Sequence, residues 1–558
     1  MIQQNFIELY ESSFKKYWNL PAITNYNNAT TYTYANVAKT IAKVHLLLKE
    51  AGVQKGDKIS LIGKDSAEWC MVYLGVITYG AIIVPILQDF HANDILHIIE
   101  HSDSRVVFVS QSHYKVMEPF RMGAVSVVID IDSLKPLEQF SINKSLVSLD
   151  VEALFQARYP NDFTKEDIAY PHISNDEVML INYTSGTTGY SKGVILTANN
   201  LAGNVTYANY LKLMFEQERV LCFLPMAHAY SCAFNFLTPM QCGTHIYVLG
   251  TTPTPSILVK ALKEVKPHLI ISVPLILEKI YKNVITPKIS KGAAKFLIKT
   301  PLLSSVVYKK VRDTLFENMG GNFREFIVGG AALNEEVVDF LKKAKFPFTV
   351  GYGMTECAPL ISYEHHQKYV ANSCGKPLKE IMEVRIFEPD STTGIGEIQV
   401  RGENVCKGYY KNAEETEKLF TADGWLRTGD LGYMDRQKNI FIKGRSKTML
   451  LGPSGQNIYT EGIEAKLTMM EYVGETVIVM NSSQKLVALI YPDVERVQKE
   501  KLTTEQLEQI MKQNIAHLNE QLASYEQVAS FVLRDEEFEK TPKRSIKRFL
   551  YTDILTNP

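Results

Sequence analysis

The sequence predicts an α/β fold: a large N-terminal domain of parallel sheets flanked by helices, with a small β subdomain, and a small α+β C-terminal domain. In the first half, short β-branched runs alternate with segments of helical periodicity, which is typical of parallel strands covered by helices. After about residue 380, short strands separated by glycine and acidic turns indicate an antiparallel subdomain. We expect the domains to be 1–443 and 444–558.

The elements of the first half follow from apolar spacing. Val37, Ile41, Val44 and Leu48 recur at helical spacing, and Gly52 follows where a helix C-cap belongs. Residues 69–87 have nearly the length of a transmembrane helix, but glycine interrupts them, so we interpret them as a core helix and a strand. Apolar runs predict further strands at 58–63, 105–110, 125–130, 268–273 and 323–330.

The second half is predicted from shorter patterns. The runs EVRIFEP, GEIQVRG and KNIFIKG are expected to be strands of the antiparallel subdomain. In the last segment, TVIVM and KLVALIYP are expected strands. Leu507, Ile510 and Leu518 share one face of an expected helix, with Thr503 and Gln506 placed as its capping box.

Composition excludes several classes of protein. A chain of 558 residues is too long for one hydrophobic core, and 46% hydrophobic with 22% charged residues is the balance of an ordinary globular protein. The formal net charge of −1 gives no basic surplus for nucleic acid. The seven cysteines form no Cys-x-x-Cys pair and no signal peptide is visible, so we expect free thiols and a cytoplasmic location.

The most informative stretch is Tyr183-Thr-Ser-Gly-Thr-Thr-Gly-Tyr-Ser-Lys-Gly-Val194, which follows the apolar run VMLIN and is expected to leave the end of a strand. Glycines let backbone N–H groups approach phosphate oxygens, hydroxyls add neutral donors, and Lys192 supplies positive charge. Because Gly193 follows the lysine, the loop is not a Walker A motif. We predict a polyphosphate-binding loop formed by Thr184, Ser185, Gly186, Thr187, Thr188, Gly189 and Lys192.

The string TSGTTGYSKGV resembles the phosphate-binding signature of the adenylate-forming superfamily, which includes acyl-CoA synthetases, luciferases and adenylation domains of peptide synthetases. Its usual proline is replaced by Tyr190-Ser191. Further strings follow in the family's order: LPMAHAY, GGAALNEEV, GYGMTECAP, GWLRTGDLGYMD and FIKGRSK. Within the superfamily, KPHLIISVPLILEKIY and GQNIYTEGIE are most similar to long-chain fatty acyl-CoA synthetases.

The resemblance implies activation of a carboxylic acid by ATP to acyl-AMP and then by CoA to a thioester, and it favours a medium- or long-chain fatty acid as the substrate. Glu356, with Thr184, would ligate Mg²⁺, and Thr355 would donate to the α-phosphate. Asp430 would accept hydrogen bonds from the ribose hydroxyls. The remaining implied nucleotide contacts are Gly330, Ala331, Ala332, Gly351, Tyr352 as the adenine-stacking ring, Gly353 and Arg445.

Three further roles are implied. His228 would line the acyl pocket beside the reacting carboxylate, although a lone histidine is commonly structural. Lys443 occupies the family's hinge position, about which a mobile C-terminal domain would rotate between half-reactions. The family's C-terminal catalytic lysine falls on Ser545 without a gap, and Lys543 and Lys547 flank it. We favour Lys547 and leave Lys543 open.

Alternatives remain at this stage. The acyl acceptor could be a carrier-protein thiol instead of CoA, or the chain could be an inactive nucleotide- or lipid-binding homologue, for which the serine at 545 is the only support. The sequence leaves oligomeric state and acyl chain length open. Peripheral contact with the inner membrane face is also open, since no amphipathic basic helix demands it.

Overall fold

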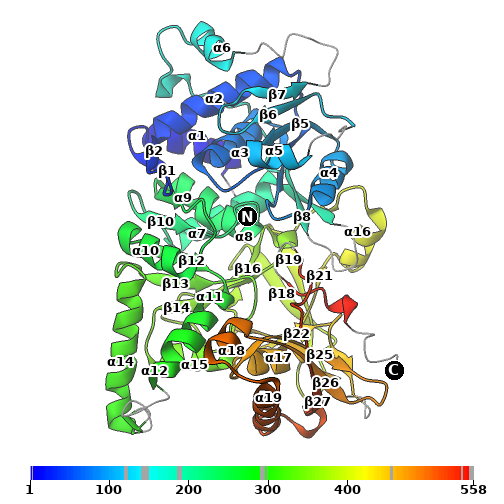
Figure 1. Cartoon of the computed structure of the whole chain (residues 1–558). Helices are drawn as coiled ribbons and strands as arrows, with labels where there is room; N and C mark the ends of the chain where they lie inside the picture. The colour runs from blue at the N-terminus through cyan, green and yellow to red at the C-terminus, as the bar shows by residue number, and fades with distance from the viewer. Residues whose placement is uncertain are drawn as a thin grey trace.

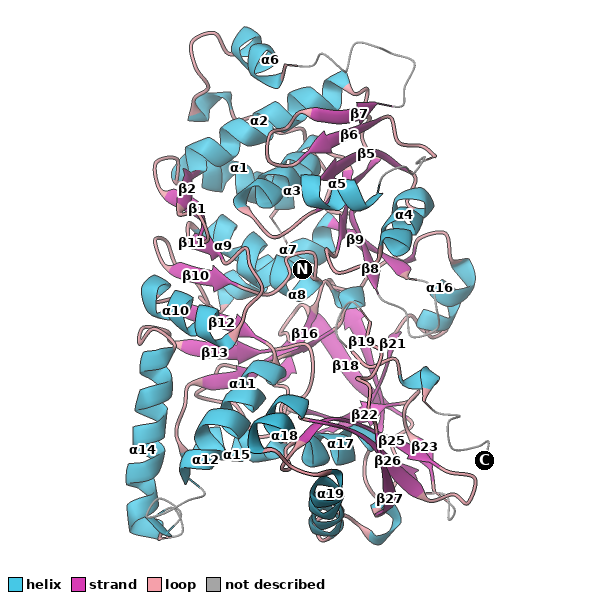
Figure 2. Ribbon diagram, in the orientation of Figure 1, coloured by secondary structure: helices cyan, strands magenta, loops and turns pink. Residues whose placement is uncertain are grey.

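The computed structural model describes residues 2, 4–117, 123–139, 150–184, 191–289, 296–297, 300–452, 456–541 and 545–551. Figure 1 shows an eight-stranded sheet at the top, a seven-stranded sheet below it, and the orange-to-red C-terminal segment at the bottom. The predicted α/β class with a separate antiparallel region is confirmed (Figure 2).

The eight-stranded sheet has the order β20-β9-β8-β4-β3-β5-β6-β7. Neighbours from β8 to β6 are parallel, whereas β20, β9 and β7 pair antiparallel. Its strands are β3 (Lys58–Ile62), β4 (Ile82–Ile86), β5 (Ser104–Val109), β6 (Val127–Asp130), β7 (Pro136–Gln139), β8 (Val178–Thr184), β9 (Lys192–Thr197) and β20 (Gly408–Tyr409). Accompanying helices are α2 (Tyr34–Glu50), α3 (Ala67–Tyr79), α4 (Ala92–His101), α5 (Gln111–Met117) and α6 (Val151–Arg158).

The apolar segment 69–87 folds as predicted. Helix α3 ends at Gly80, whose φ of 91° is a left-handed conformation that glycine adopts without strain, and β4 follows. Nearly all of α3 is buried, which explains its continuous apolar character. Among the helices of the described residues, none has the length and apolar character needed to cross a bilayer.

The seven-stranded sheet has the order β14-β13-β12-β10-β11-β1-β2 and is parallel except at β2. Its strands are β1 (Pro21–Asn25), β2 (Thr30–Thr33), β10 (Arg219–Cys222), β11 (His245–Val248), β12 (Leu269–Ser272), β13 (Glu325–Val328) and β14 (Phe348–Val350). Its helices include α1 (Phe6–Lys16), α7 (Ala198–Tyr210), α8 (Ala229–Ser231), α9 (Thr238–Cys242), α10 (Pro255–Val265), α11 (Pro274–Ile280), η4 (Tyr281–Ile285), α12 (Thr286–Ile289), α14 (Pro301–Asn318) and α15 (Glu335–Lys343).

The antiparallel subdomain is the four-stranded sheet β18 (Met382–Phe387), β19 (Gly396–Gly402), β21 (Leu426–Met434) and β22 (Ile440–Arg445). A second small sheet joins β15 (Tyr352–Gly353), β16 (Leu360–Tyr363) and β17 (Lys376–Pro377). Helix α16 (Ala413–Leu419) lies between β20 and β21 in the chain. All three strands predicted for this region are present.

The C-terminal segment is an α+β unit. It contains β23 (Leu450–Leu451), β24 (Asn457–Ile458), α17 (Thr460–Thr468), β25 (Val473–Met480), β26 (Leu486–Pro492), α18 (Val494–Glu500), α19 (Thr504–Asn519) and β27 (Val528–Leu533). Thr503 and Gln506 form the predicted capping box. The buried face of α19 consists of Leu507, Met511, Ile515 and Leu518, so Ile510 lies beside the predicted stripe.

The apolar core follows the same division. One large cluster runs from Phe6 to Ile440, and two smaller clusters lie between Ile458 and Tyr551. The sequence-based boundary after Lys443 falls between these clusters, inside β22. That boundary and the hinge role of Lys443 remain predictions.

Candidate active site

A cavity of about 2710 Å³ brings together residues from both large sheets, the antiparallel sheet and the C-terminal segment. Its lining contains these predicted site residues: Thr184, Lys192, His228, Gly330, Ala331, Ala332, Gly351, Tyr352, Gly353, Thr355, Glu356, Asp430, Lys443 and Arg445. Ser185, Gly186, Thr187, Thr188 and Gly189 lie outside the described residues. The tertiary structure therefore collects side chains that are more than 250 positions apart in sequence around one space.

The two ends of the predicted phosphate loop are held together by β-pairing. Strand β8 ends at Thr184 and β9 begins at Lys192, and these two residues are partners in an antiparallel register. The Lys192 ammonium forms an ion pair with Glu415 of α16 and lies 5.1 Å from the centroid of the Tyr409 ring. A cation is thus fixed at the start of β9, directly beside the cavity.

Glu356 is oriented by Tyr409. Glu356 lies in the short helix η5 (Thr355–Cys357), and its carboxylate accepts a hydrogen bond of 2.8 Å from the Tyr409 hydroxyl. The Cys406 amide also donates to the Glu356 carbonyl at 2.8 Å. Burial raises the pKa of Tyr409, with Glu356 adding to the effect, so Tyr409 stays a neutral donor. The sequence analysis did not single out Tyr409.

Asp430 stands between an arginine and a tyrosine. It is paired with Arg445 in the β21–β22 ladder, with 3.2 Å between Arg445 Nε and Asp430 Oδ1. The Tyr352 hydroxyl donates to Asp430 Oδ2 at 2.7 Å. Burial raises the pKa of Asp430, while Arg445 and Tyr352 favour its charged form. Three residues predicted from three separate strings are therefore in direct contact.

The segment around His228 is held by residues that sequence reasoning missed. His228 is the N-cap of α8 and lines the cavity. The Met226 amide donates to Asp65 Oδ1 at 3.0 Å, and the Asn182 side-chain amide donates to the Ala227 carbonyl at 3.0 Å. Burial raises the pKa of Asp65 to about 7. The sequence feature that could have pointed to Asp65 is an acidic residue between two apolar elements, strand β3 and helix α3.

The Gly329–Ala332 segment leaves the end of β13 and passes close to an aromatic ring. A Cβ atom on Gly329 would lie 2.7 Å from the Tyr230 ring, and the hydroxyl of that tyrosine donates to the Ile327 carbonyl at 3.2 Å. Gly330 has φ of 92°. Both glycines are therefore required by local geometry as well as lining the cavity.

One part of the cavity lining is apolar. Helix α10, strand β12, helix α11 and helix α14 with its C-cap residue contribute Leu258, Leu262, Ile270, Ile276, Leu315 and Met319 to this lining. Most of these side chains are buried in the fold while still facing the cavity. The cavity thus has a charged end near Lys192 and Glu356 and an apolar extension between helices.

The last described part of the C-terminal segment contributes Thr541, Ser545, Ile546, Arg548 and Phe549 to the cavity lining. Arg548 pairs with Glu464, with 2.7 Å between Nη1 and Oε1, and burial raises the pKa of Glu464 to about 7 against the opposing effect of Arg548. Lys547 is not among the lining residues; its ammonium pairs with Glu539. Its catalytic role remains a prediction, and Lys543 lies outside the described residues.

Two side chains of the N-terminal part bind the C-terminal segment. The Lys282 ammonium donates to the carbonyls of Thr468 and Val473, at 2.6 Å each. The Asn334 amide donates to the Ala465 carbonyl at 2.8 Å. Burial lowers the pKa of Lys282 to about 8. These bonds fix α17 against η4 in the arrangement seen here.

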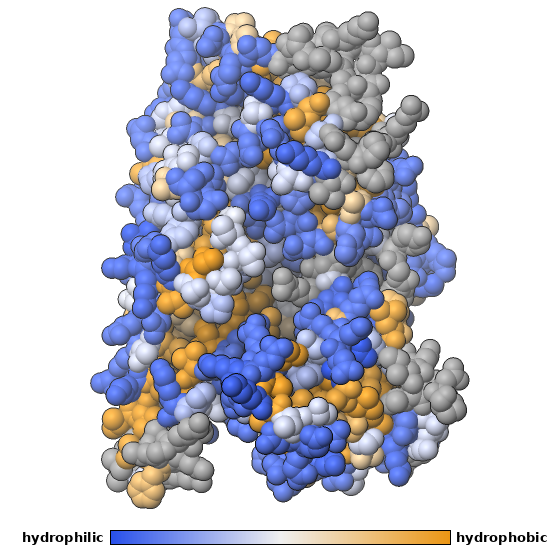
Figure 3. Space-filling view, in the orientation of Figure 1, coloured by the Kyte–Doolittle hydropathy of each residue, from blue (hydrophilic) through white to orange (hydrophobic). Residues whose placement is uncertain are grey.

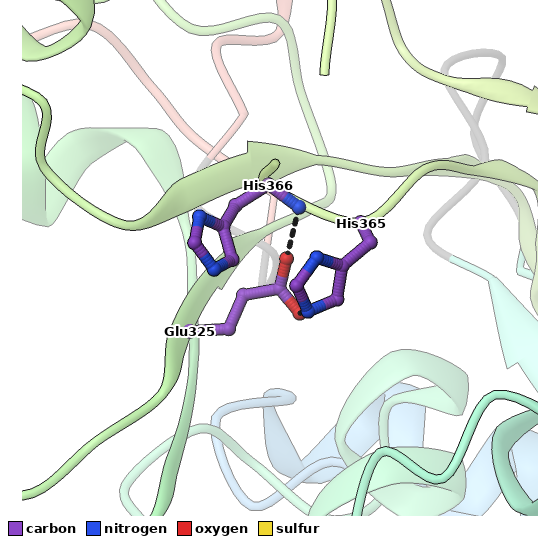
Figure 4. Close-up of side chains that lie close together, drawn as sticks. All are labelled: Glu325, His365 and His366. Atoms are coloured by element: carbon purple, nitrogen blue, oxygen red, sulfur yellow. Dashed lines mark hydrogen bonds and ion pairs between the residues drawn. The ribbon is translucent and has the colours of Figure 1, made fainter. Parts of the chain in front are cut away.

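A separate polar cluster is formed by Glu325, His365 and His366 (Figure 4), whose potential metal-ligating atoms lie within 4.8 Å of one another. Glu325 accepts hydrogen bonds from the His366 amide at 2.5 Å and the Tyr363 hydroxyl at 2.6 Å. These bonds anchor the chain that follows β16 to the start of β13. We assign the cluster this structural role.

Comparisons with known proteins find relatives over most of the chain. The long-chain-fatty-acid–CoA ligase FadD15 of Mycobacterium tuberculosis is 27% identical over 495 residues, covering 84% of this chain and 78% of that protein. Long-chain-fatty-acid–CoA ligase 1 of Saccharomyces cerevisiae is 25% identical over 531 residues, covering 87% and 74%. These proteins are relatives along most of their length.

The fold is shared with solved structures of low sequence identity. The anthranilate CoA ligase AuaEII in complex with anthranoyl-AMP has a TM-score of 0.79 at 18% identity, covering 100% of this chain and 98% of that chain. MatB from Rhodopseudomonas palustris with bound ATP has a TM-score of 0.75 at 20% identity, covering 99% of each chain. The sequence model described as AMP-binding enzyme matches residues 10–410, and the chain belongs to this family.

Proposed function

We propose that this protein is an ATP-dependent acyl-CoA ligase that activates a long-chain fatty acid through an acyl-AMP intermediate. The observation that carries the proposal is the single cavity in which a charged end, with Lys192, Glu356 and Asp430, continues into an apolar part lined by α10, α11 and α14. A substrate with one carboxylate and a long hydrocarbon tail fits both ends.

In the first half-reaction, a carboxylate oxygen of the fatty acid bonds to the α-phosphorus of ATP. The bond from that phosphorus to the bridging oxygen breaks, and pyrophosphate leaves. Lys192 would neutralise the departing phosphates, Thr355 would donate to the α-phosphate, and Asp430 would accept from the ribose hydroxyls. Lys192 is paired with Glu415 in the arrangement seen here, and its ammonium has three N–H donors, so it can also contact a phosphate.

The residues at the charged end fit a magnesium ion. The carboxylate of Glu356 and the hydroxyl of Thr184 both line the cavity, and oxygen donors suit this hard cation. When bound, the ion would supply positive charge to the phosphate oxygens. The contribution of the chain is to orient Glu356 through Tyr409. The solved structure of MenE from Bacillus subtilis with ATP and magnesium ion, a neighbour in fold, supports this choice of metal.

In the second half-reaction, the sulfur of CoA bonds to the acyl carbon, the bond from that carbon to the AMP oxygen breaks, and the thiol proton passes to solvent. This step requires access for a thiol to the carbonyl carbon. We infer that the C-terminal domain rotates about Lys443 between the two steps, which would open the Lys282 and Asn334 bonds to α17.

The choice of a fatty acid rests on two supports. The relatives from Mycobacterium tuberculosis and Saccharomyces cerevisiae are named long-chain-fatty-acid–CoA ligases. The lining residues from α10 and β12 are all apolar, namely Pro255, Leu258, Val259, Leu262, Ile270 and Ile271, which favours an aliphatic tail over a polar acid.

The direct test is to incubate the purified protein with ATP, magnesium and acids of increasing chain length, with and without CoA, and to identify products by mass spectrometry. We expect acyl-CoA from long-chain acids only when CoA is present. Accumulation of acyl-AMP without thioester would transfer the assignment to a carrier-protein ligase. Absence of adenylate with every acid would contradict the proposal and favour an inactive binding homologue.

A further inference from the structure

Within the part of the chain that the structure describes, the buried carboxylate of Glu325 has no lysine or arginine paired with it. Glu325 begins β13 and is 2% exposed, and the adjacent Arg324 pairs with Glu218 instead. Its ionic partner is His365, with 3.9 Å between Nε2 and Oε2. Burial raises the pKa of Glu325. Buried carboxylates are normally paired with a cation or bound to a metal ion, so this one lacks a full compensating charge in direct contact.

Two imidazole rings flank this carboxylate. After β16 the chain turns, and the Lys368 amide donates to the His365 carbonyl at 2.8 Å, which places His365 and His366 at the start of the turn. The centroids of the two rings are 4.5 Å apart, and Figure 4 shows the Glu325 carboxylate between the rings. One potential ligand atom from each of the three side chains lies within 4.8 Å of the other two.

The hydrogen bonds of the cluster leave its ligand atoms available. The anchoring bonds described above come from the His366 amide to Oε1 of Glu325 and from the Tyr363 hydroxyl to Oε2, and each carboxylate oxygen keeps a second lone pair. The ring nitrogens of His366 accept or donate no hydrogen bond among the described residues. Burial, with His365 and Lys342, lowers the pKa of His366 to about 4, so its ring is the neutral form that metal ions bind.

The donor set of one carboxylate and two imidazoles suits a zinc ion, with water in the fourth position. Zinc–nitrogen distances of about 2.0–2.1 Å place ligand atoms roughly 3.3 Å apart, so the cluster has to close by about 1.5 Å. Both rings are half-buried, and rotation of their side chains supplies this movement. The Nδ1 atom of His365 accepts a long bond of 3.4 Å from the Gln367 amide. Binding at Nε2 moves the ring proton to Nδ1 and releases that exposed bond.

The cluster is separate from the cavity. Figure 3 shows apolar side chains gathered in a hollow beside α11, a helix that lines the cavity, whereas Glu325, His365 and His366 are not part of that lining. The magnesium ligands proposed there are oxygen atoms, which suit a hard cation, and imidazole nitrogens suit zinc. The two sites therefore differ in place and in the metal that they select.

We propose that Glu325, His365 and His366 bind one zinc ion, which links the start of β13 to the turn after β16. The His366 amide and Glu325 are 41 positions apart in sequence. Strand β13 leads into Gly329–Ala332, and β16 follows η5, so the ion fastens together two segments that lead to the cavity. Zinc binding goes beyond the proposed activity and does not depend on it.

The test is isothermal titration calorimetry of the untagged, chelator-treated full chain with zinc chloride, without nucleotide or acid. We expect one zinc ion per chain and a melting temperature that rises with zinc concentration. His365→Ala and His366→Ala should each weaken binding at least about 100-fold, because losing a second-shell partner alone costs about 10–100-fold. Tyr363→Phe deletes only such a partner of Glu325 and should weaken binding about tenfold.

The matched control is His172, an exposed histidine beside a single carboxylate, that of Glu8. His172→Ala should bind zinc like the wild type. Cobalt chloride in place of zinc gives visible absorption that reports the metal ligands, and we expect the same spectrum from wild type and His172→Ala. The His365 and His366 variants should lose it, and magnesium chloride should not displace the bound ion. A wild-type melting temperature without zinc shows that each variant is folded.

A wild type that takes up no zinc in calorimetry would overturn the proposal. So would His365 and His366 variants that bind zinc and cobalt as tightly as His172→Ala does, because the metal would then lie elsewhere. These titrations contain no substrate, so their outcome is independent of acyl-CoA formation. Absence of acyl-CoA formation by the wild type would concern the proposed activity alone.

Discussion

The hydroxyl of Tyr409 donates a hydrogen bond of 2.8 Å to the carboxylate of Glu356. The same aromatic ring lies 5.1 Å from the Lys192 ammonium, at the start of β9. Tyr409 thereby joins the proposed magnesium ligand to the proposed phosphate-binding cation. The three residues come from η5, β20 and β9, which are distant in sequence and adjacent in the fold.

Removing this hydroxyl should weaken the response of the enzyme to magnesium. Tyr409→Phe keeps the ring and deletes the donor to a charged group, which is worth about 1.5–3 kcal/mol. We expect the magnesium concentration for half-maximal pyrophosphate release to rise about tenfold. Tyr410→Phe is the matched control, because the Tyr410 hydroxyl bonds to Asp103. Equal magnesium dependence of both variants would refute the positioning role.

The C-terminal lysine can be assigned by separating the half-reactions. Lys547→Ala should abolish formation of acyl-AMP while sparing thioester formation from supplied acyl-AMP, because the predicted contact exists only during adenylation. Lys547 pairs with Glu539 in this arrangement, so the pair has to open first. Lys543→Ala is the comparison. Normal adenylation by the Lys547 variant would remove this residue from the role.

The apolar part of the cavity should set the chain length. Leu258 lines the cavity, whereas its neighbour Ile257 is 38% exposed and is not part of the lining. Leu258→Trp should lower the ratio of kcat/KM for palmitate to that for octanoate at least about tenfold, since the larger ring occupies space needed by the tail. Ile257→Trp should leave the ratio unchanged. If both variants kept the wild-type ratio of kcat/KM for palmitate to octanoate, the acyl tail of the substrate would not lie beside Leu258.

Asp65 should make the folded state less stable as pH rises. Burial raises its pKa from 3.8 to about 7, so between these values the folded state holds a proton that the unfolded state has released. Stability from this group is present below about pH 4 and is lost as pH approaches 7. Asp65→Asn keeps an oxygen for the Met226 amide and removes the titration.

Urea unfolding of the ligand-free protein at pH 5 and pH 8 measures the effect. Between pH 5 and pH 8, the wild type should lose about 1–2 kcal/mol more unfolding free energy than Asp65→Asn does. The full pKa shift, at 1.36 kcal/mol per pKa unit, would give a larger change in unfolding free energy. We expect the smaller value because Asp65 borders the open cavity, where solvent lowers the cost of its charge. A constant difference would mean that Asp65 is ionised throughout this range.

The sequence by itself determined the class of fold and most of its elements. The runs at 58–63 and 268–273 became parallel strands, and the 69–87 segment became a helix and a strand, because apolar periodicity and glycine placement act over a few residues. The phosphate loop, Glu356 and Asp430 were recognisable since their order along the chain resembles a known family.

Only the tertiary structure decided which of these residues touch. The contacts of Tyr409 with Glu356 and of Asp65 with the segment before His228 join positions that no local pattern relates. The pairing of Lys547 with Glu539, and the gathering of apolar residues from α10, β12 and α14 around the cavity, likewise depend on how separate elements pack. Local propensity acts over a few residues along the chain, so it can be read from the sequence. Cavities, burial and ion pairs arise from long-range packing, so only the tertiary structure shows which residues lie close together.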